Sequence, residues 1–475
     1  MGNNERLNNK AGRIERHLGL RALTRGPMPP LGFGVLFPAR TLLRRGARRE
    51  PLRRVLPHGP AAARIWRTAA AGLLLVLVTA GGVRADDLAA RLKALADTTI
   101  KEDESVGIVL GVAREGQNPV IQASGRARVT PAMPMTPDID LKAASIGKTF
   151  IAALVLELAD EGSLGLDDKL SRYLPNVANA NRVTLRQLLN HTSGYDDYIT
   201  DEFLDTVHAH RGKSWTLSEL LDYVPSQLLE APGTRYDYSN TNYLLLSLVV
   251  QSVTGHSVVV EIRRHFLEPL ALTHTWFASE EQVPVDKLAH GYSELGDDGS
   301  RVDATDDPWP LGGADGGMVT NAGDLVIWAR TLFGGHLLSQ RRLKEMLDFV
   351  DASDDDAAPG SGYGLGVERL RIEGITFYGH TGSTPGYNDM LLYEPATKTV
   401  IVIAINDDPE DEDLLDVIAL RVVQALEEGG AFHFPRSADP QAAAPAQTAP
   451  SSSPSSKPAS KPSPTSPSGA APAKE

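Results

Sequence analysis

Short runs of apolar and β-branched residues near both ends of the central part of the chain predict β-strands. Two early runs, 106–113 and 120–124, are separated by a polar turn that contains Gly and Pro. Near the other end four runs follow one another closely: 364–370, 376–378, 388–393 and 399–405. The last run is continuously apolar, which is typical of a strand buried on both faces.

The stretch between these two groups of strands is helical in pattern. Four apolar segments bounded by turn or cap residues are predicted helices: 151–158, 185–189, 243–253 and 325–333. Another helix, 414–426, is predicted after the last strand. The pattern therefore predicts an α+β fold (an α/β sandwich), in which an antiparallel sheet is flanked by terminal helices and a helical subdomain is inserted at about 162–355.

The first 85 residues differ from the rest in charge. Residues 1–85 contain 16 Lys and Arg against three acidic residues, and their apolar run, 69–80, is preceded by arginines and followed by small residues at Val83 and Ala85. This order is typical of a secretory signal peptide. The expected location is periplasmic or secreted. The alternative is an uncleaved membrane anchor, although the run is short for a span of about 20 residues.

The rest of the chain divides into a domain and a tail. Residues 86–435 carry the strand and helix patterns and are predicted to fold as one domain. Residues 436–475 are rich in Pro, Ala and Ser and are predicted to be disordered, because they contain too few apolar side chains to offset the entropy of ordering. After residue 85 the chain has 31 basic and 57 acidic residues, which disfavours binding to nucleic acid. The absence of cysteine excludes disulfides and thiol catalysis.

A serine and a lysine three residues apart provide the first candidate chemistry. Ser145-Ile-Gly-Lys148 is the only S-x-x-K sequence in the chain, and an apolar helix is predicted directly after it. Residues three apart on a helix share a face, so the hydroxyl and the ammonium are expected to meet. Burial disfavours the charged ammonium, so Lys148 can take part in the proton transfer that a serine nucleophile needs. Taken alone, the motif fits a structural role better: a helix-capping serine, and a lysine whose stem is buried while its ammonium reaches solvent.

Two further motifs occur once each and in a fixed order. Tyr238-Ser-Asn240 precedes a predicted helix, and its tyrosine could act as a base while its asparagine contacts a substrate amide. The sequence 380–382, His-Thr-Gly, ends a strand pattern, where a strand edge could pair with an extended substrate. Taken alone, each motif fits a structural role better: a helix cap with a packed tyrosine for the second motif, and a structural histidine for the third.

Together, in this order, the three motifs resemble those of the serine β-lactamase and penicillin-binding-protein superfamily, most closely its class C-like branch. The resemblance implies an active site between the sheet and the helical subdomain, with no cofactor or metal. It makes Ser145 the acylated nucleophile, and Lys148 and Tyr238 the groups that transfer its proton. The residues that it implies for substrate binding are Asn240, His380, Thr381, Gly382 and Ser383, with the backbone N–H groups of Ser145 and Ser383 as the oxyanion hole. Class C β-lactamases usually have Lys where this chain has His380, which weakens the β-lactamase interpretation.

These features predict an exported serine hydrolase that cleaves an amide or an ester. A D-Ala-D-Ala carboxypeptidase-type peptidase is the leading candidate, acting on peptidoglycan stem peptides. The alternatives are an esterase, a β-lactamase, or a non-catalytic relative that binds penicillin or the cell wall. No nucleic-acid partner is expected, and a membrane is expected only through an uncleaved N-terminal anchor.

Overall fold

The computed structural model describes residues 85–103, 105–293, 301–307, 316–352, 360–408, 414–428, 430 and 432–436. Apart from Ala85 and Arg436, the predicted leader and the predicted tail lie outside these residues.

A nine-stranded sheet organises the described residues, and every neighbouring pair of its strands is antiparallel. The strand order is β3–β2–β1–β14–β13–β12–β11–β10–β9, in which the short outer strands are β3 (Met133–Pro134), β9 (Val350–Asp351) and β10 (Gly362–Tyr363). The strands that matter here are β1 (Gly107–Ala113), β2 (Val120–Arg128), β11 (Glu368–Ile372), β12 (Ile375–Thr384), β13 (Tyr387–Glu394) and β14 (Thr399–Ile405). Strands from both ends of the chain meet where β1 pairs with β14, so the predicted antiparallel sheet and the α+β class are confirmed.

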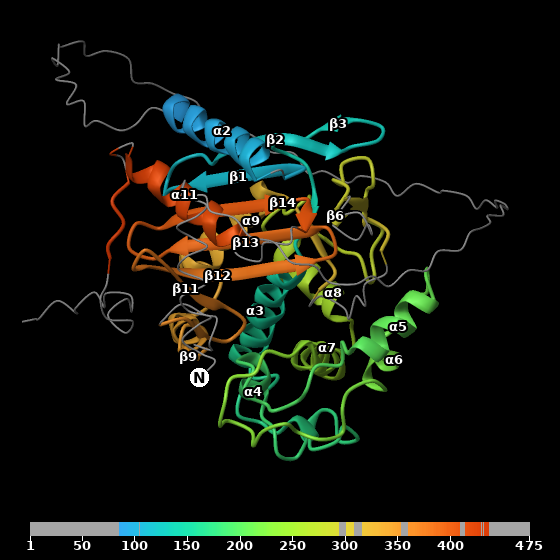
Figure 1. Ribbon diagram of the computed structural model, residues 1–475. Coiled ribbons are helices and arrows are strands. Elements are labelled where there is room, and N and C mark those ends of the chain that lie inside the picture. Colours follow the sequence, from blue (N-terminus) through green and yellow to red (C-terminus); the bar gives the residue numbers. More distant parts are fainter. Residues whose placement is uncertain are drawn as a thin grey trace, which may run out of the picture.

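Helices cover both faces of the central strands. The first and last described helices, α2 (Ala85–Glu102) and α11 (Leu414–Glu428), pack on one face, where Leu92, Ile418 and Val422 join a single apolar cluster (Figure 1). On the other face lies α9 (Ala322–Phe333). Every residue of β1 and β14 is consequently buried, which explains the continuous apolar pattern of 399–405.

The region between the two groups of strands holds most of the remaining helices. Its central helix is α3 (Gly147–Asp160), of which twelve residues are buried. Helices α7 (Asn240–Thr254) and α8 (Val258–Ile262) contact it, α4 (Leu185–Leu189) and α6 (Leu217–Leu221) contact α7, and α5 (Asp201–Ala209) lies beside α6. The region also contains short strands of two small sheets, so the insertion predicted at about 162–355 is not purely helical.

No single helix in the described part of the chain is long and apolar enough to cross a membrane. Only α7, taken together with the segment 258–267 and bent by 75° relative to it, reaches the required length and composition. Nine residues of α7 are buried within the protein.

Several predicted boundaries differ from the observed ones. The run 364–370 was predicted as one strand, but β11 begins at Glu368 because Gly364 and Gly366 belong to the preceding turn, where Gly366 has φ +75°. The predicted strand 376–378 is longer in the structure, since β12 continues through the His-Thr-Gly sequence to Thr384.

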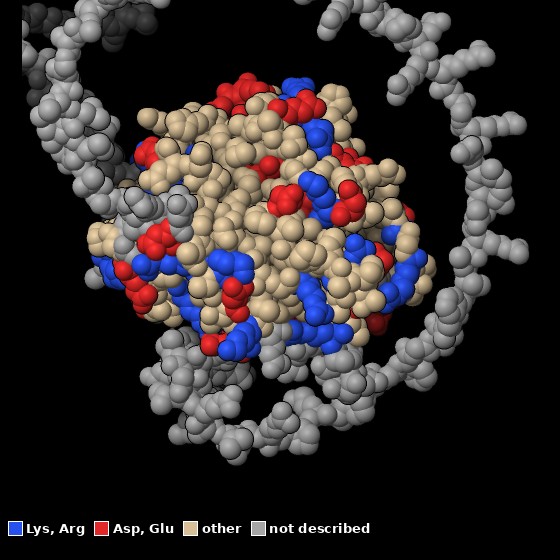
Figure 2. Space-filling model, turned by 90° about the horizontal axis from the view of Figure 1, so that it is seen from above, with Lys and Arg blue, Asp and Glu red and all other residues tan. Residues whose placement is uncertain are grey.

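The charges on the face seen from above are mixed, with acidic and basic side chains interspersed (Figure 2).

Candidate active site

Ser145 lies in a tight turn at the start of the central helix. A 3₁₀ helix, Ala144–Ile146, leads directly into α3, so Ser145 and Lys148 lie one helical turn apart, as the sequence predicts. Ala144, the residue before the serine, has φ +42°. A non-glycine residue in this region costs about 1–3 kcal/mol, and such strain is concentrated at functional sites. The strained turn fixes the direction in which Ser145 projects.

Lys148 is fully buried and connects two of the motifs. Its Nζ donates hydrogen bonds to Ser145 Oγ at 2.9 Å and to Asn240 Oδ1 at 2.8 Å. The ammonium also lies 5.1 Å from the ring centre of Tyr238 and 5.7 Å from that of Tyr243. Aromatic faces at these distances stabilise a cation that has lost its water.

Asn240 is held in one orientation by a residue that the sequence did not single out. Its backbone N–H and its Nδ2 both donate to Asp197 Oδ2, at 3.0 and 2.8 Å. With the amide nitrogen bound to the carboxylate, Oδ1 is left to face Lys148. Asp197 is therefore a positioning residue for Asn240.

The ring of Tyr238 packs against a buried histidine. The ring of His191 stacks on the ring of Tyr238 at 4.2 Å between centroids. Nδ1 of His191 accepts from the Ser239 N–H at 3.1 Å and from Asn242 Nδ2 at 3.0 Å. Burial lowers the pKa of His191 well below its usual value, and the positive charge of Lys148 lowers it further. His191 is therefore a neutral support for Tyr238.

His380 in the third motif is buried, and both of its ring nitrogens have hydrogen-bond partners. Its Nδ1 lies 2.6 Å from the Thr381 carbonyl oxygen, and its Nε2 lies 2.9 Å from Tyr363 Oη. A carbonyl oxygen can only accept, so Nδ1 donates and Nε2 accepts from the tyrosine. Burial lowers the pKa of His380, although the nearby Glu368 raises it in part. The imidazole is thus neutral near pH 7.

Gly382 allows the third motif to approach the nucleophile. A Cβ atom at this position would lie 2.3 Å from the Ala143 carbonyl oxygen and 3.4 Å from the Ser145 backbone nitrogen. The sequence predicted that this glycine admits a substrate. The observed reason is that strand β12 itself passes directly against the turn that carries Ser145.

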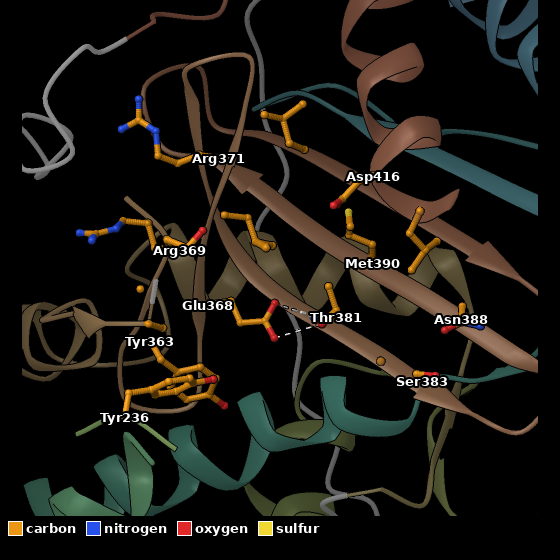
Figure 3. A pocket seen from close by; sticks show the side chains of 17 residues that line it. Tyr236, Tyr363, Glu368, Arg369, Arg371, Thr381, Ser383, Asn388, Met390 and Asp416 are labelled. Atoms are coloured by element: carbon orange, nitrogen blue, oxygen red, sulfur yellow. Dashed lines mark hydrogen bonds between the residues drawn. The ribbon is translucent and has the colours of Figure 1, made fainter. Parts of the chain in front are cut away.

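A cavity of about 430 Å³ adjoins this site along the edge of β12. Its lining includes Thr381, Gly382 and Ser383, whereas Ser145 does not line it. Glu368 points toward Thr381 within the cavity, while Arg369 and Arg371, which also line the cavity, extend away from Thr381 (Figure 3). The cavity is consequently an extension of the site along the strand.

The structure thus brings the three predicted motifs into one cluster. Ser145, Lys148 and Asn240 are linked by hydrogen bonds, and the rings of Tyr238 and His380 lie 6.4 Å apart. Sequence reasoning missed the functional importance of three residues. His191 lies two residues after the predicted helix 185–189, and no local signal marks Asp197 or Glu368.

The family model named Beta-lactamase matches residues 92–425, which include all three motifs. The chain belongs to the beta-lactamase family. Its members share the serine β-lactamase and penicillin-binding-protein fold, so the resemblance inferred from the motifs is confirmed. Membership of this family supports a serine hydrolase.

Curated relatives include penicillin-binding protein 4* of Bacillus subtilis (strain 168), which is 27% identical over 66% of this chain and 71% of that protein. Protein flp of Staphylococcus aureus is 33% identical in strain MW2 and 28% identical in strain COL. The chain spans only 37% and 62% of the lengths of those two proteins.

Solved structures of similar fold include amidases. A D-amino acid amidase from Ochrobactrum anthropi SV3, in complex with D-phenylalanine, is 27% identical with a TM-score of 0.66 and covers 72% of this chain and 99% of its own. A D-stereospecific amidohydrolase from Streptomyces sp. is 27% identical with a TM-score of 0.62, over 72% of this chain and 98% of its own.

Proposed function

We propose that this chain hydrolyses an amide bond through an acyl-enzyme on Ser145 and that its substrates are D-aminoacyl compounds. The observation that carries the proposal is the hydrogen-bonded chain from Ser145 through Lys148 to Asn240, with Tyr238 beside the ammonium. The similarity to a D-amino acid amidase and to a D-stereospecific amidohydrolase supports the substrate class.

The reaction assigned to these residues has two halves. Ser145 Oγ attacks the carbonyl carbon while its proton passes to the Lys148–Tyr238 pair, which then protonates the departing amine. The backbone N–H groups of Ser145 and Ser383 receive the developing oxyanion, since Gly382 holds their two segments close together. Water then attacks the acyl-enzyme and gives a proton to the same pair, which passes it to Ser145 Oγ as the bond between Oγ and the acyl carbon breaks.

A D-Ala-D-Ala carboxypeptidase is the second candidate, favoured by the similarity to penicillin-binding protein 4*. Such an enzyme must hold the free carboxylate of its substrate. The third motif is where the family resemblance implies a cation for this purpose, but His380 is buried with a lowered pKa. Thr381 already binds the carboxylate of Glu368. The site therefore favours an amidase over a carboxypeptidase.

A labelling and hydrolysis experiment tests the proposal. The purified full chain is treated with a fluorophosphonate probe and assayed on D-alanine p-nitroanilide, p-nitrophenyl acetate, nitrocefin and a D-Ala-D-Ala peptide. We expect labelling and hydrolysis of the anilide, and loss of both in Ser145→Ala. Ser218→Ala, at an exposed position of α6, is the matched control and should label like the wild type.

Each other outcome supports another candidate. Labelling with turnover of the ester alone indicates an esterase, and turnover of nitrocefin alone indicates a β-lactamase. An unlabelled wild type indicates a non-catalytic relative. Labelling that persists in Ser145→Ala contradicts the assignment of the nucleophile.

We also propose that the protein is exported, on the basis of the basic flank, apolar run and small residues within 1–85. Expression in a Gram-negative host followed by fractionation and N-terminal sequencing should find the protein outside the cytoplasm, with its N-terminus near Asp86. Full-length chain in the soluble cytoplasmic fraction would contradict export.

A further inference from the structure

Part of the edge of β12 has no neighbouring strand. The pairing between β11 and β12 ends at Glu368 and Gly379, whereas the pairing between β12 and β13 continues to Thr384. Within the described residues, the segment from Thr381 to Thr384 therefore has a strand partner on one side only. Its open side is the edge along which an extended substrate could pair.

The carboxylate of Glu368 occupies the first position on this open edge. It accepts hydrogen bonds from the Thr381 backbone N–H and from Thr381 Oγ1, both at 3.1 Å. Alternation along the strand places Ser383 two residues further on the same edge, and Ser383 lines the cavity that Glu368 also lines. A substrate that reaches Ser145 along this edge must therefore pass beside the carboxylate.

The negative charge of Glu368 is not neutralised by the groups closest to it. His380 Nδ1 lies 3.4 Å from the carboxylate, but the lowered pKa of His380 leaves the imidazole neutral near pH 7. On the same strand, Arg369 donates to the Gly360 carbonyl oxygen, and Arg369 and Arg371 both extend away from Thr381 (Figure 3). The Glu368 side chain is 17% exposed, so the carboxylate is accessible from the cavity.

The chemistry of this position favours one kind of substrate. A carboxylate has about four acceptor positions, of which Thr381 uses two, so further donors can bind. A substrate carboxylate would be repelled and would find the Thr381 hydroxyl and N–H already bonded. An ammonium group carries three donors and a positive charge, and it would form charge-assisted hydrogen bonds here.

We propose that Glu368 is a specificity-determining residue that selects substrates with a free, positively charged amino group close to the scissile amide. This inference rests on the proposed amide hydrolysis by Ser145 and adds a charge requirement to it. The D-aminoacyl compounds selected are those with an unblocked amino terminus. Substrates with a blocked amino group lose the contact with Glu368, and those with a terminal carboxylate near Thr381 are disfavoured.

A matched pair of substrates tests the inference in the full-length enzyme. D-Alanine p-nitroanilide and its N-acetyl derivative share the scissile bond and differ in the charge of the amino group at pH 7. We expect the wild type to prefer the free amine. Glu368→Gln should lower kcat/KM for the free amine by roughly 10–100-fold, the range of a lost charge-assisted hydrogen bond, and change that for the acetylated substrate by less than about twofold.

Two further variants distinguish specificity from a structural role. Glu368→Lys should reduce turnover of the free amine further and increase turnover of a peptide that ends in D-Ala-D-Ala. Asp416→Asn removes another negative charge from the lining of the same cavity, further from Thr381, and should leave the preference unchanged.

The results separate this inference from the proposed function. Equal losses on both substrates in Glu368→Gln would show a structural role, and an unchanged preference would show that Glu368 does not contact the amino group. Either result overturns the inference while amide hydrolysis stands. If the wild type hydrolyses no amide at all, the proposed function itself fails.

Discussion

At the scale of single residues, the site consists of side chains whose orientations are fixed by their neighbours. Asn240 presents its acceptor Oδ1 to Lys148 because its backbone N–H and its Nδ2 both donate to Asp197. Tyr238 is held against Lys148 because His191 stacks on its other side. Pre-organisation of this kind reduces the reorganisation needed during the reaction, and this lowers the barrier.

Lys148 and Tyr238 are expected to act as one unit in proton transfer. Lys148→Ala and Tyr238→Phe should each lower kcat by about 10²–10⁴, the usual contribution of a positioned acid or base. Because both changes interrupt the same transfer, the double variant should lose far less than the product of the two effects. The measurement is kcat on D-alanine p-nitroanilide, with Tyr223→Phe on the exposed surface as the control. Multiplicative losses would mean that the two residues work independently.

At the scale of elements, the site depends on the close contact between strand β12 and the 3₁₀ turn that carries Ser145. Strand β12 passes the 3₁₀ turn so closely that Gly382 has no room for a side chain. Strand β12 pairs with β13 through Thr384, so the part of β12 that contacts the turn is held by hydrogen bonds to a central strand of the sheet. The position of Ser383 relative to Ser145 is therefore determined by the sheet and not by a loop.

Replacement of Gly382 by alanine should separate the strand from the turn. The new methyl group would lie 2.3 Å from the backbone oxygen of Ala143, so one of the two segments must move. We expect the unfolding free energy to fall by about 1–3 kcal/mol, as for overpacking, and acylation of Ser145 to slow by about 10²-fold or more, as for a lost oxyanion donor. Thermal unfolding and the rate of fluorophosphonate labelling measure the two effects.

The matched control for this change is another glycine within the sheet. A Cβ atom at Gly111 in β1 would lie 3.4 Å from Val402 and 3.5 Å from Ala322, which is ordinary contact. Gly111→Ala should therefore label at the wild-type rate. If Gly382→Ala also labels normally, the close contact between β12 and the turn is not needed to place Ser383.

The elements that the sequence predicted well are those whose pattern reflects burial along the chain. Residues 399–405 and 185–189 match β14 and α4, and Asn321 caps α9 through a 2.9 Å bond from the Asp324 N–H. The sequence predicted a helix at this end of the domain but not its bounds. Helix α2 begins at Ala85, the last residue of the predicted leader, so no separate start was visible in the pattern.

The three motifs, which the structure brings together, could be recognised in the sequence because each carries its own chemistry in a short stretch. The roles of Asp197 and Glu368 could not be predicted, because each depends on a partner far away in the chain. Asp197 meets Asn240 across 43 residues, and Glu368 meets Thr381 across two different strands. Local patterns do not encode contacts of this kind.

At the scale of the whole molecule, the site lies where the sheet meets the helical region. His380 comes from the sheet and His191 from the segment after α4, and both pack around the ring of Tyr238. Bringing these groups together buries ionisable side chains, so the stability of the fold depends on pH. Burial lowers the pKa of both histidines, whereas it raises the pKa of Asp140 to about 6.

The pH dependence of stability should therefore contain a measurable contribution from His191. Its pKa is well below 6.5 in the fold and near 6.5 in the unfolded chain, so between these values the unfolded chain binds more protons. The unfolding free energy should then be unaffected by His191 above about pH 7 and fall by about 1.4 kcal/mol per pH unit below about pH 6. Asp140 contributes with the opposite sign between about pH 4 and 6, because the fold favours its protonated form.

The difference in unfolding free energy between the wild type and His191→Asn isolates the contribution of His191. In His191→Asn, Oδ1 can still accept from the Ser239 N–H, but the side chain no longer titrates. Asp140 is present in both proteins and is not among the groups that shift the pKa of His191, so its contribution cancels in the difference. His380 also lowers the pKa of His191, so any change in the titration of His380 is part of the measured difference. Denaturant unfolding from pH 8 to pH 5 should show the stability advantage of the wild type over His191→Asn shrinking steadily below about pH 6.5. Parallel profiles would mean that the pKa of His191 is the same in the folded and unfolded states, and Tyr238 would then lie against an imidazolium below about pH 6.5.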